Sequence, residues 1–267
     1  MSRRLPWLAA LASLLAAGAC FGQAAQVVVD LRTRPGVKER MLVVEPGKPS
    51  AVLVLMAGGN GHIGIYDNGG LRSEGNFLVR SRALFVQRGA AVLLLDVPSD
   101  HDRPPYLSGE FRESDEHAAD IGAAIAWARA RWGLPVWLVG TSRGTQSAAY
   151  AATVLTGASA PDGLVLSSTI LAEGRMPAAR PVQEMALEKL RVPVLVLHHG
   201  EDQCPVTPPS LLPALMAKLP PATSRLITYQ GGHASGAACD AFAFHGYNGI
   251  EDQVVADIAA FVAAHPR

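Results

Sequence analysis

Short, largely apolar stretches alternate along this chain with longer stretches in which apolar residues recur at every third or fourth position. The short stretches lie at residues 51–56, 90–96, 136–139, 163–167 and 192–198. Runs of this length and polarity are typical of strands that are buried on both faces of a parallel sheet. We expect a further strand at 225–229, and two short β segments, 27–31 and 41–44, separated by a Pro-Gly turn.

Helical periodicity fills the intervals between these strands. The segment 114–132 shows it most clearly, with Ser114 as the candidate N-cap. The other predicted helices are 76–88, 145–154, 210–218 and 251–264. This alternation predicts a single α/β domain over residues 25–267, a doubly wound, mostly parallel sheet flanked by helices. Residues 168–191 are too few for a substantial cap over the sheet, so we expect little or no lid.

The charge balance excludes one class of partner. The chain of 267 residues contains 23 Lys and Arg and 23 Asp and Glu, which gives a net charge of zero, and no long basic run is present. Neither a basic domain nor a basic tail is available to neutralise phosphates, so we expect no nucleic-acid partner.

The first 24 residues have the features of an export signal peptide rather than of a folded element. Arginines at 3–4 precede an apolar region at 5–19, and small residues follow it, as signal peptidase requires. The apolar region is too short to span a bilayer comfortably, and no other stretch is long and apolar enough to do so. We therefore expect a periplasmic or secreted protein; the alternative is a lipoprotein anchored at Cys20.

The cysteine count supports export. Cleavage or lipidation removes Cys20 from consideration and leaves Cys204 and Cys239 as an even pair. Oxidising compartments favour disulfides, so we expect a Cys204–Cys239 disulfide. Two buried, unpaired thiols are the alternative.

The strand at 136–139 leads into Gly-Thr-Ser-Arg-Gly at 140–144, which matches the pattern G-x-S-x-G. In this motif a serine lies on a strained turn between a strand and a helix, with its hydroxyl exposed above the sheet edge. Glycines suit the two flanking positions, where a side chain would crowd the adjacent strand or helix. The five residues alone are a weak signal, but the predicted strand before them and helix after them supply the required context. Ser142 is therefore the candidate nucleophile.

A glycine-rich loop, Ala-Gly-Gly-Asn-Gly at 57–61, follows the strand at 51–56. Glycines let backbone N–H groups approach a substrate oxygen closely, which one half of an oxyanion hole requires. We assign this half to the N–H of Gly59 or its neighbour Asn60, and the other half to the N–H of Arg143. A flexible turn is the alternative, whereas a phosphate-binding loop would need a Lys and a Ser or Thr that are missing here.

A carboxylate just beyond a late strand completes the chain order Ser…Asp…His. Asp202 follows the strand at 192–198 and is the candidate acid, with Glu201 as the alternative. Asp202 could instead cap the helix that follows, but that helix begins too far away for a cap.

Two histidines compete for the role of the base. His233 directly follows the last strand, but the small residues after it give its ring little to pack against. His245 lies between Phe244 and Tyr247, whose rings can fix the loop, and a catalytic base needs such support to keep its geometry. We favour His245 and expect His233 at the rim of the site.

No metal or cofactor is expected. Asp100, His101 and Asp102 are adjacent in sequence, and three adjacent residues cannot all converge on one ion without strain. No distant pair of ligands at a metal-binding spacing accompanies them.

The glycine loop, the G-x-S-x-G segment, the late aspartate and the later histidine resemble the α/β-hydrolase superfamily over essentially all of residues 25–267. More narrowly, the segment 139–145 and His-Gly-Tyr-Asn-Gly-Ile-Glu at 245–251 resemble exported bacterial hydrolases with no assigned substrate. The resemblance implies a serine esterase-like mechanism on a small-molecule acyl substrate. It implies no particular substrate, because this fold hosts esterases, amidases, thioesterases, transferases and proteins that are not enzymes.

The expected function is hydrolysis of a carboxylic ester, or a related acyl bond, through an acyl-enzyme on Ser142. The side chain of Arg143 either attracts an anionic substrate group or is simply solvated or ion-paired. Two rival functions follow from the same fold: a non-catalytic binding protein of the cell envelope, and an acyltransferase or peptidase that uses the same three residues. An intact set of Ser, Asp and His speaks against the first rival.

Overall fold

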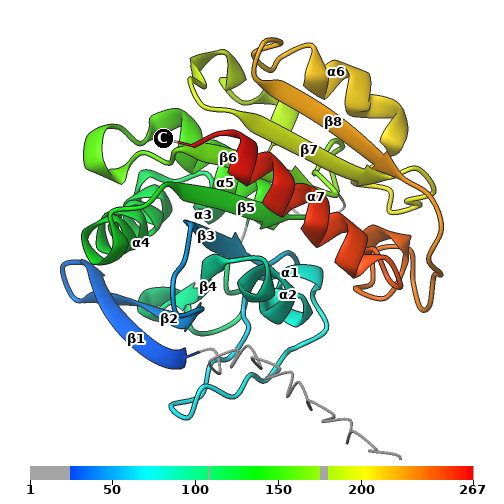
Figure 1. Cartoon of the computed structure of the whole chain (residues 1–267). Helices are drawn as coiled ribbons and strands as arrows, with labels where there is room; N and C mark the ends of the chain where they lie inside the picture. The colour runs from blue at the N-terminus through cyan, green and yellow to red at the C-terminus, as the bar shows by residue number, and fades with distance from the viewer. Residues whose placement is uncertain (1–24, 108, 175–179, 267) are drawn as a thin grey trace, which may run out of the picture.

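The computed structural model describes residues 25–107, 109–174 and 180–266, so the expected export signal at 1–24 lies outside the described residues. An eight-stranded sheet crosses the molecule with helices on both of its faces (Figure 1). Its strands follow the order β1-β2-β4-β3-β5-β6-β7-β8. The strands are β1 (Ala25–Arg34), β2 (Val37–Glu45), β3 (Ala51–Met56), β4 (Ala90–Pro98), β5 (Val136–Thr141), β6 (Gly163–Ser167), β7 (Val194–His199) and β8 (Ser224–Tyr229).

Strand direction divides this sheet into two parts. The hairpin β1–β2 is antiparallel and joins β4 in antiparallel register, whereas all pairs from β4 to β8 are parallel. Every residue of β3, β5 and β7 is buried, as expected for central strands of a parallel sheet that is covered on both faces. The predicted doubly wound, mostly parallel sheet is confirmed. Its parallel strands all end at the same edge.

Helices cover the two faces of the sheet. One face carries α4 (Asp115–Trp132), α5 (Gly144–Val154) and α6 (Leu212–Met216), and the short α3 (Gly109–Arg112) lies against α4 and α5. The other face carries α1 (Phe77–Arg80), α2 (Arg82–Gln87) and α7 (Glu251–Ala264). As predicted, Ser114 caps α4 by accepting the N–H of His117 at 3.1 Å.

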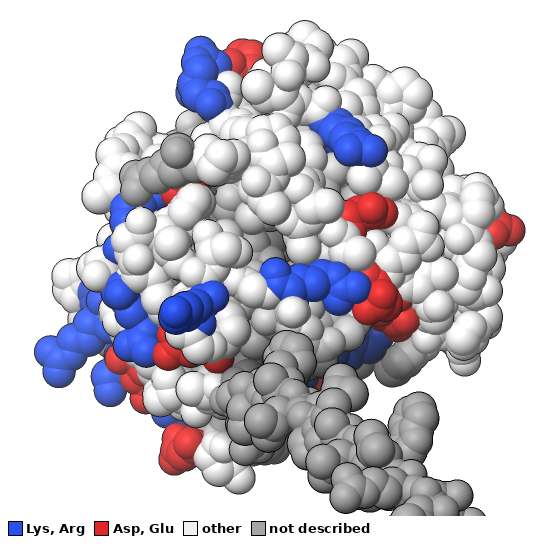
Figure 2. Space-filling view, in the orientation of Figure 1, with Lys and Arg blue, Asp and Glu red and all other residues white. Residues whose placement is uncertain are grey.

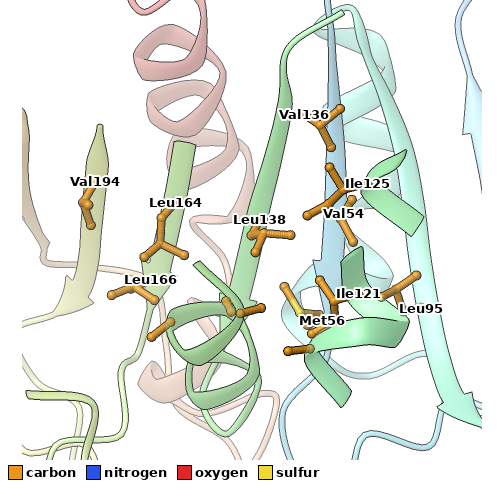
Figure 3. Close-up of a cluster of buried hydrophobic side chains, with 14 of the residues drawn as sticks. Val54, Met56, Leu95, Ile121, Ile125, Val136, Leu138, Leu164, Leu166 and Val194 are labelled. Carbon is orange, nitrogen blue, oxygen red and sulfur yellow. The ribbon is translucent and has the colours of Figure 1, made fainter. Parts of the chain in front are cut away.

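Alternation along the strands builds two hydrophobic cores. In β3, Val52 and Val54 belong to the core beneath α4 and α5, whereas Leu53 and Leu55 belong to the core beneath α1, α2 and α7. Figure 3 shows the first core, in which Ile121 and Ile125 of α4 lie over the strands. The apolar positions that recur at helical spacing in the sequence are therefore the ones that pack against the sheet.

Two predicted helices are shorter than expected. The segment 76–88 is divided at Ser81 into α1 and α2. There the guanidinium of Arg82 donates to the carbonyl of Val79 at 2.7 Å, a carbonyl that a continuous helix would use internally. The segment 210–218 begins as a 3₁₀ turn, Pro209–Leu211, and continues as α6.

The connection from β6 to β7 bears on the expected absence of a lid. In its described parts the regular structure is limited to two 3₁₀ turns, Val182–Glu184 and Leu187–Lys189. Leu171 and Met185 from this connection are buried in the core beneath α4 and α5. The described residues of this segment therefore pack onto the domain instead of forming a cap over the sheet edge.

Glu39 is a buried carboxyl group in the antiparallel part of the sheet. Glu39 of β2 is 1% exposed, and neither of its oxygens has a hydrogen-bond partner among the described residues. Burial first, and then the nearby carboxylates of Asp120 and Asp96, raise the pKa of Glu39 well above its ordinary value. The folded state therefore favours the protonated form of this side chain.

The surface carries mixed charge. On the face that Figure 2 shows, most atoms belong to uncharged residues, and basic and acidic side chains lie among one another. Within the described part of the chain, no helix combines the length and apolarity needed to cross a bilayer.

Candidate active site

Ser142 lies where β5 ends and α5 begins, at the edge of the sheet. Its backbone has φ +53°, in the left-handed region that is costly for a residue with a side chain. Hydrogen bonds hold this turn from both sides. The N–H of Ser142 donates to the backbone carbonyl of Ser167 at 3.0 Å, and the hydroxyl of Thr145 donates to the carbonyl of Ser142 at 2.6 Å. The strained turn that the motif predicts is present.

The flanking glycines explain why this turn can form. A Cβ on Gly140 would overlap the carbonyl of Gly144, and a Cβ on Gly144 would overlap the carbonyl of Met56. A third glycine, which the sequence reasoning did not single out, is equally constrained: a Cβ on Gly58 would lie 2.8 Å from Cβ of Ser142. The loop after β3 and the turn after β5 therefore touch backbone to backbone.

Asp202, in the loop after β7, and His245, in the segment before α7, lie in direct contact. Oδ2 of Asp202 lies 2.9 Å from Nδ1 of His245, and the hydroxyl of Thr207 donates to the same Oδ2 at 2.8 Å. The N–H of Cys204 donates to Oδ1 at 2.9 Å. With the carboxylate at Nδ1, Nε2 of His245 is left to face the cavity that His245 lines. The structure thus brings together two residues that are 43 positions apart.

The environment of Asp202 keeps this carboxyl group ionised. Burial alone would raise its pKa, but hydrogen bonding with His198, with His245 and with the N–H of Cys204 outweighs burial. The pKa of Asp202 is therefore held well below its ordinary value. A buried, ionised carboxylate at Nδ1 fixes the tautomer of His245 and would stabilise its protonated form.

Buried aromatic packing anchors the loop that carries His245. Tyr247 is fully buried, and its hydroxyl donates to the carbonyl of Leu197 at 2.8 Å and accepts the N–H of Ser168 at 3.0 Å. The hydroxyl of Ser168 also donates to the carbonyl of His245 at 2.7 Å. A Cβ on Gly246 would overlap the carbonyl of Ala241, so the neighbouring segment packs directly on this loop.

The competing residues lie elsewhere. His233 is exposed, its N–H donates to the carbonyl of Asn248 at 3.0 Å, and it does not line the cavity that contains Ser142. Glu201 is also exposed, and its contact with a histidine is through its backbone, whose N–H donates to Nδ1 of His199 at 3.1 Å. Of the alternatives weighed from the sequence, the structure brings His245 and Asp202 together and leaves His233 and Glu201 apart.

A cavity of about 290 Å³ lies between these elements. Ser142 and His245 both line it, and no direct hydrogen bond joins their side chains among the described residues. Such bonds are often long before substrate binds. The remaining walls combine polar and apolar groups: Asn60, Ser73, Asn76 and Asp240 on one hand, and Ile63, Phe77, Val79 and Ala241 on the other.

The backbone around this cavity offers donors for an oxyanion. Gly58, Gly59 and Asn60 line it, and Gly59 has φ +60°. The N–H groups of Gly59, Asn60 and Arg143 donate to no backbone carbonyl of a described residue. Arg143 directly precedes α5, so its N–H belongs to the unpaired set at a helix N-terminus, where negative charge is favoured.

The Cys204–Cys239 disulfide is present and adjoins the site. Cys204 is buried beside Asp202, and Cys239 lines the cavity itself. Two supporting residues, Thr207 and His198, were missed by sequence reasoning because their contacts depend on how the loop after β7 folds back. Nε2 of His198 donates to the carbonyl of Thr207 at 2.9 Å.

The residues considered for a metal site, Asp100 and His101, have other partners in the structure. His101 stacks on Phe111, with ring centroids 3.6 Å apart, and Asp100 pairs with Arg34 at 2.9 Å. Among the described residues, no three His, Cys, Asp or Glu side chains are grouped as a metal site would require.

The mostly parallel eight-stranded sheet with helices on both faces is that of the α/β-hydrolase fold. No protein-family model matches the sequence, and no curated protein sequence matches it. Solved structures do match along most of the chain. They include esterases and dienelactone hydrolases, all of which share a low percentage of identical residues with this protein.

Three of these structures illustrate the likeness. Dienelactone hydrolase from Anabaena variabilis has a TM-score of 0.67 at 17% identity, over 92% of this chain and 100% of its own. An esterase from Pyrococcus furiosus has a TM-score of 0.64 at 10% identity, over 91% and 93%. Est1E from Butyrivibrio proteoclasticus, with ferulic acid bound, has a TM-score of 0.60 at 14% identity, over 89% and 98%. At these identities the likeness establishes the fold.

Proposed function

We propose that this protein is a serine hydrolase that cleaves a carboxylic ester, or a related acyl bond, of a small molecule. Ser142 would be the nucleophile, His245 the general base and Asp202 the carboxylate that orients His245. One observation carries the proposal: a buried Asp202–His245 hydrogen bond of 2.9 Å opens onto the same cavity as a serine on a strained strand-to-helix turn. The esterases among the similar structures give it independent support.

The proposed reaction begins with transfer of the hydroxyl proton of Ser142 to Nε2 of His245. Oγ then bonds to the acyl carbon, and the carbonyl electron pair moves onto oxygen. Backbone N–H groups of Arg143 and of Gly59 or Asn60 would hold that oxyanion. Each such donor contributes about 3–4 kcal/mol to the transition state in comparable sites.

Collapse of this intermediate breaks the bond to the leaving alcohol, which takes the proton from Nε2. The acyl group remains on Ser142. A water molecule then gives a proton to His245 and attacks the acyl carbon, and the carboxylic acid leaves as Oγ recovers its proton. The charge on Asp202 stabilises the imidazolium that forms in both halves of the reaction.

The cavity favours a compact substrate. Its volume of about 290 Å³ lies at the lower end of the range of pockets that bind small molecules. Because its walls mix amide, hydroxyl and carboxylate groups with apolar side chains, we expect short acyl chains to be preferred over long aliphatic ones. The disulfide also favours export, since such bonds persist in oxidising compartments.

The test is a panel of p-nitrophenyl esters from acetate to decanoate, assayed with the mature protein and with Ser142→Ala. We expect hydrolysis of the short esters, with a rate at least ~10³-fold lower in the variant. Equal rates in the two proteins would mean that Ser142 is not the nucleophile. No hydrolysis of any member, together with no labelling by a fluorophosphonate, would favour a binding protein on this fold.

A further inference from the structure

A buried arginine lies directly behind the glycine loop at 57–61. Arg112, the last residue of α3, is 1% exposed. Its guanidinium donates to the hydroxyl of Ser147 at 2.9 Å and to the carbonyls of Gly59 at 3.2 Å and Ala57 at 3.4 Å. Buried arginines usually pair with a carboxylate. This one is directed at backbone carbonyls, and no described carboxylate pairs with it.

The guanidinium stays charged in this position. Burial, and then the charge of Arg143, lower the pKa of Arg112 to about 9, which still leaves it protonated at neutral pH. His117, the other side-chain partner of Ser147, is neutral. Burial lowers the pKa of His117 to about 3, and Nε2 of His117 lies 3.0 Å from the hydroxyl of Ser147.

The peptide that Arg112 holds is the central peptide of a tight turn. The N–H of Gly61 donates to the carbonyl of Gly58 at 3.1 Å, so Gly59 and Asn60 are the two central residues. Gly59 has a positive φ of +60°, whereas Asn60 is not among the non-glycine residues with positive φ. A positive φ at the first central residue alone is the pattern of a type II′ turn.

This turn has an accessible alternative. A type I′ turn differs by rotation of the central peptide, with positive φ at both central residues. Asparagine tolerates positive φ better than most residues, so Asn60 does not by itself exclude the rotated form. In that form the carbonyl of Gly59 would turn away from Arg112, which would lose the bond. The contact with Arg112 therefore stabilises one of two orientations of the Gly59–Asn60 peptide.

The orientation matters because of where the cavity lies. In a trans peptide the C=O and N–H groups point in opposite directions, and the cis bond among the described residues is that between Pro104 and Pro105. Gly59 and Asn60 line the cavity with Ser142, whereas Arg112 does not line it and borders a separate small void instead. Holding the Gly59 carbonyl toward Arg112 turns the N–H of Asn60 toward the cavity.

We infer that Arg112 is a positioning residue for the oxyanion hole, and that the N–H of Asn60 is the donor it orients. The inference rests on the proposed function. It also decides between the two donors that the sequence left open, Gly59 and Asn60. Arg112 touches no substrate; it acts by holding the Gly59–Asn60 peptide in the orientation that a developing oxyanion requires.

Two substitutions of Arg112 test whether it orients the Gly59–Asn60 peptide or only stabilises the fold. Arg112→Met keeps the apolar stem and removes all three hydrogen bonds, so we expect kcat to fall about 10²-fold, near the loss of one oxyanion donor, with KM within about 3-fold. Arg112→Lys keeps the charge but replaces the planar fork, which reaches Ser147 and Gly59 from two different nitrogens, with a single ammonium nitrogen. It should recover part of the lost kcat, and it carries the test if Arg112→Met does not fold.

The matched control is Arg129→Met. Arg129 is also a largely buried arginine that donates to backbone carbonyls, those of Ala158 and Ala160, but it lies in α4 and pairs with Asp162 away from the cavity. This control should lower the melting temperature without lowering kcat. A loss of stability that follows the removal of either buried arginine can then be separated from a loss of oxyanion stabilisation, which we expect only at Arg112.

The decisive readout is a pair of inhibitors. A trifluoromethyl ketone adds to an activated serine and places an oxyanion in the hole, whereas the matching methyl ketone binds without charge. We expect Arg112→Met and Arg112→Lys to weaken binding of the trifluoromethyl ketone by about the factor lost in kcat/KM, with the methyl ketone little changed. Unchanged kcat, or equal weakening of both ketones, would overturn the inference. A wild-type protein inert to the trifluoromethyl ketone would overturn the proposed function instead.

Discussion

Removal of the Cys204–Cys239 disulfide tests how far the geometry of the site depends on this covalent link between two of its loops. Cys204 is buried and its N–H holds Asp202, while Cys239 lines the cavity two residues before Ala241. The carbonyl of Ala241 packs against Gly246, next to the proposed base. The disulfide therefore links the loop that carries Asp202 to the loop that carries His245. The double substitution Cys204→Ala with Cys239→Ala removes it without leaving a free thiol.

The expected loss of stability follows from the length of chain that the bond closes. The two cysteines are 35 positions apart. For a loop of this length, the chain-entropy relation gives about 4 kcal/mol at 25 °C. In a domain of this size, 1 kcal/mol lowers the melting temperature by roughly 2–4 °C, so we expect a decrease of about 10 °C. Thermal unfolding followed by circular dichroism measures it.

The activity should change as well, because both tied loops carry proposed catalytic residues. We expect kcat to fall several-fold at a temperature where the variant is fully folded, with a smaller change in KM. Treatment with dithiothreitol should reproduce both effects in the wild-type protein and change nothing in the variant. A melting temperature within about 2 °C of wild type, or a fully folded variant with unchanged kcat, would refute the reasoning.

Three further changes test other parts of the account. Asp202→Asn should lower kcat about 10³–10⁴-fold, because an amide cannot hold His245 in the required tautomer; steady-state kinetics of a variant with a wild-type circular dichroism spectrum measures this. Gly144→Ala should give little folded protein, since its methyl group would overlap the carbonyl of Met56; soluble yield and melting temperature report it, and a wild-type melting temperature would contradict it. Glu39 has a raised pKa in the folded state, so its stabilising contribution is complete below its unfolded pKa and is lost as the pH rises through its folded pKa. Glu39→Gln should therefore gain stability relative to wild type as the pH rises, by up to about 1.4 kcal/mol per unit in urea titrations, and parallel pH curves for the two proteins would contradict this.

The sequence predicted the strands and the turn at Ser142 because each depends on neighbouring residues. Uninterrupted apolar runs predict buried strands from their own composition, and glycines around a serine predict the turn without reference to the remaining fold. The disulfide required only an even pair of cysteines and an oxidising compartment. The preference for His245 rested on its aromatic neighbours, and Tyr247 is indeed fully buried beside it.

The supporting residues could not be predicted in the same way. Thr207 and His198 meet Asp202 only because the loop after β7 folds back on its own strand. Arg112 lies in a four-residue helix that shows no periodicity, and its partners are backbone carbonyls of a distant loop. A carbonyl carries no sequence signal. Such contacts become visible only when the loops are placed in three dimensions.

The most direct test of the central claim is the rate at which a fluorophosphonate labels the mature protein, with the modified peptide identified by mass spectrometry. An activated serine reacts readily, and a solvated one does not. We predict a single label on Ser142, a rate at least ~10³-fold lower in His245→Ala, and a rate within about 3-fold of wild type in His233→Ala. A label on another serine, or a loss of labelling in His233→Ala with His245→Ala unaffected, would contradict the account.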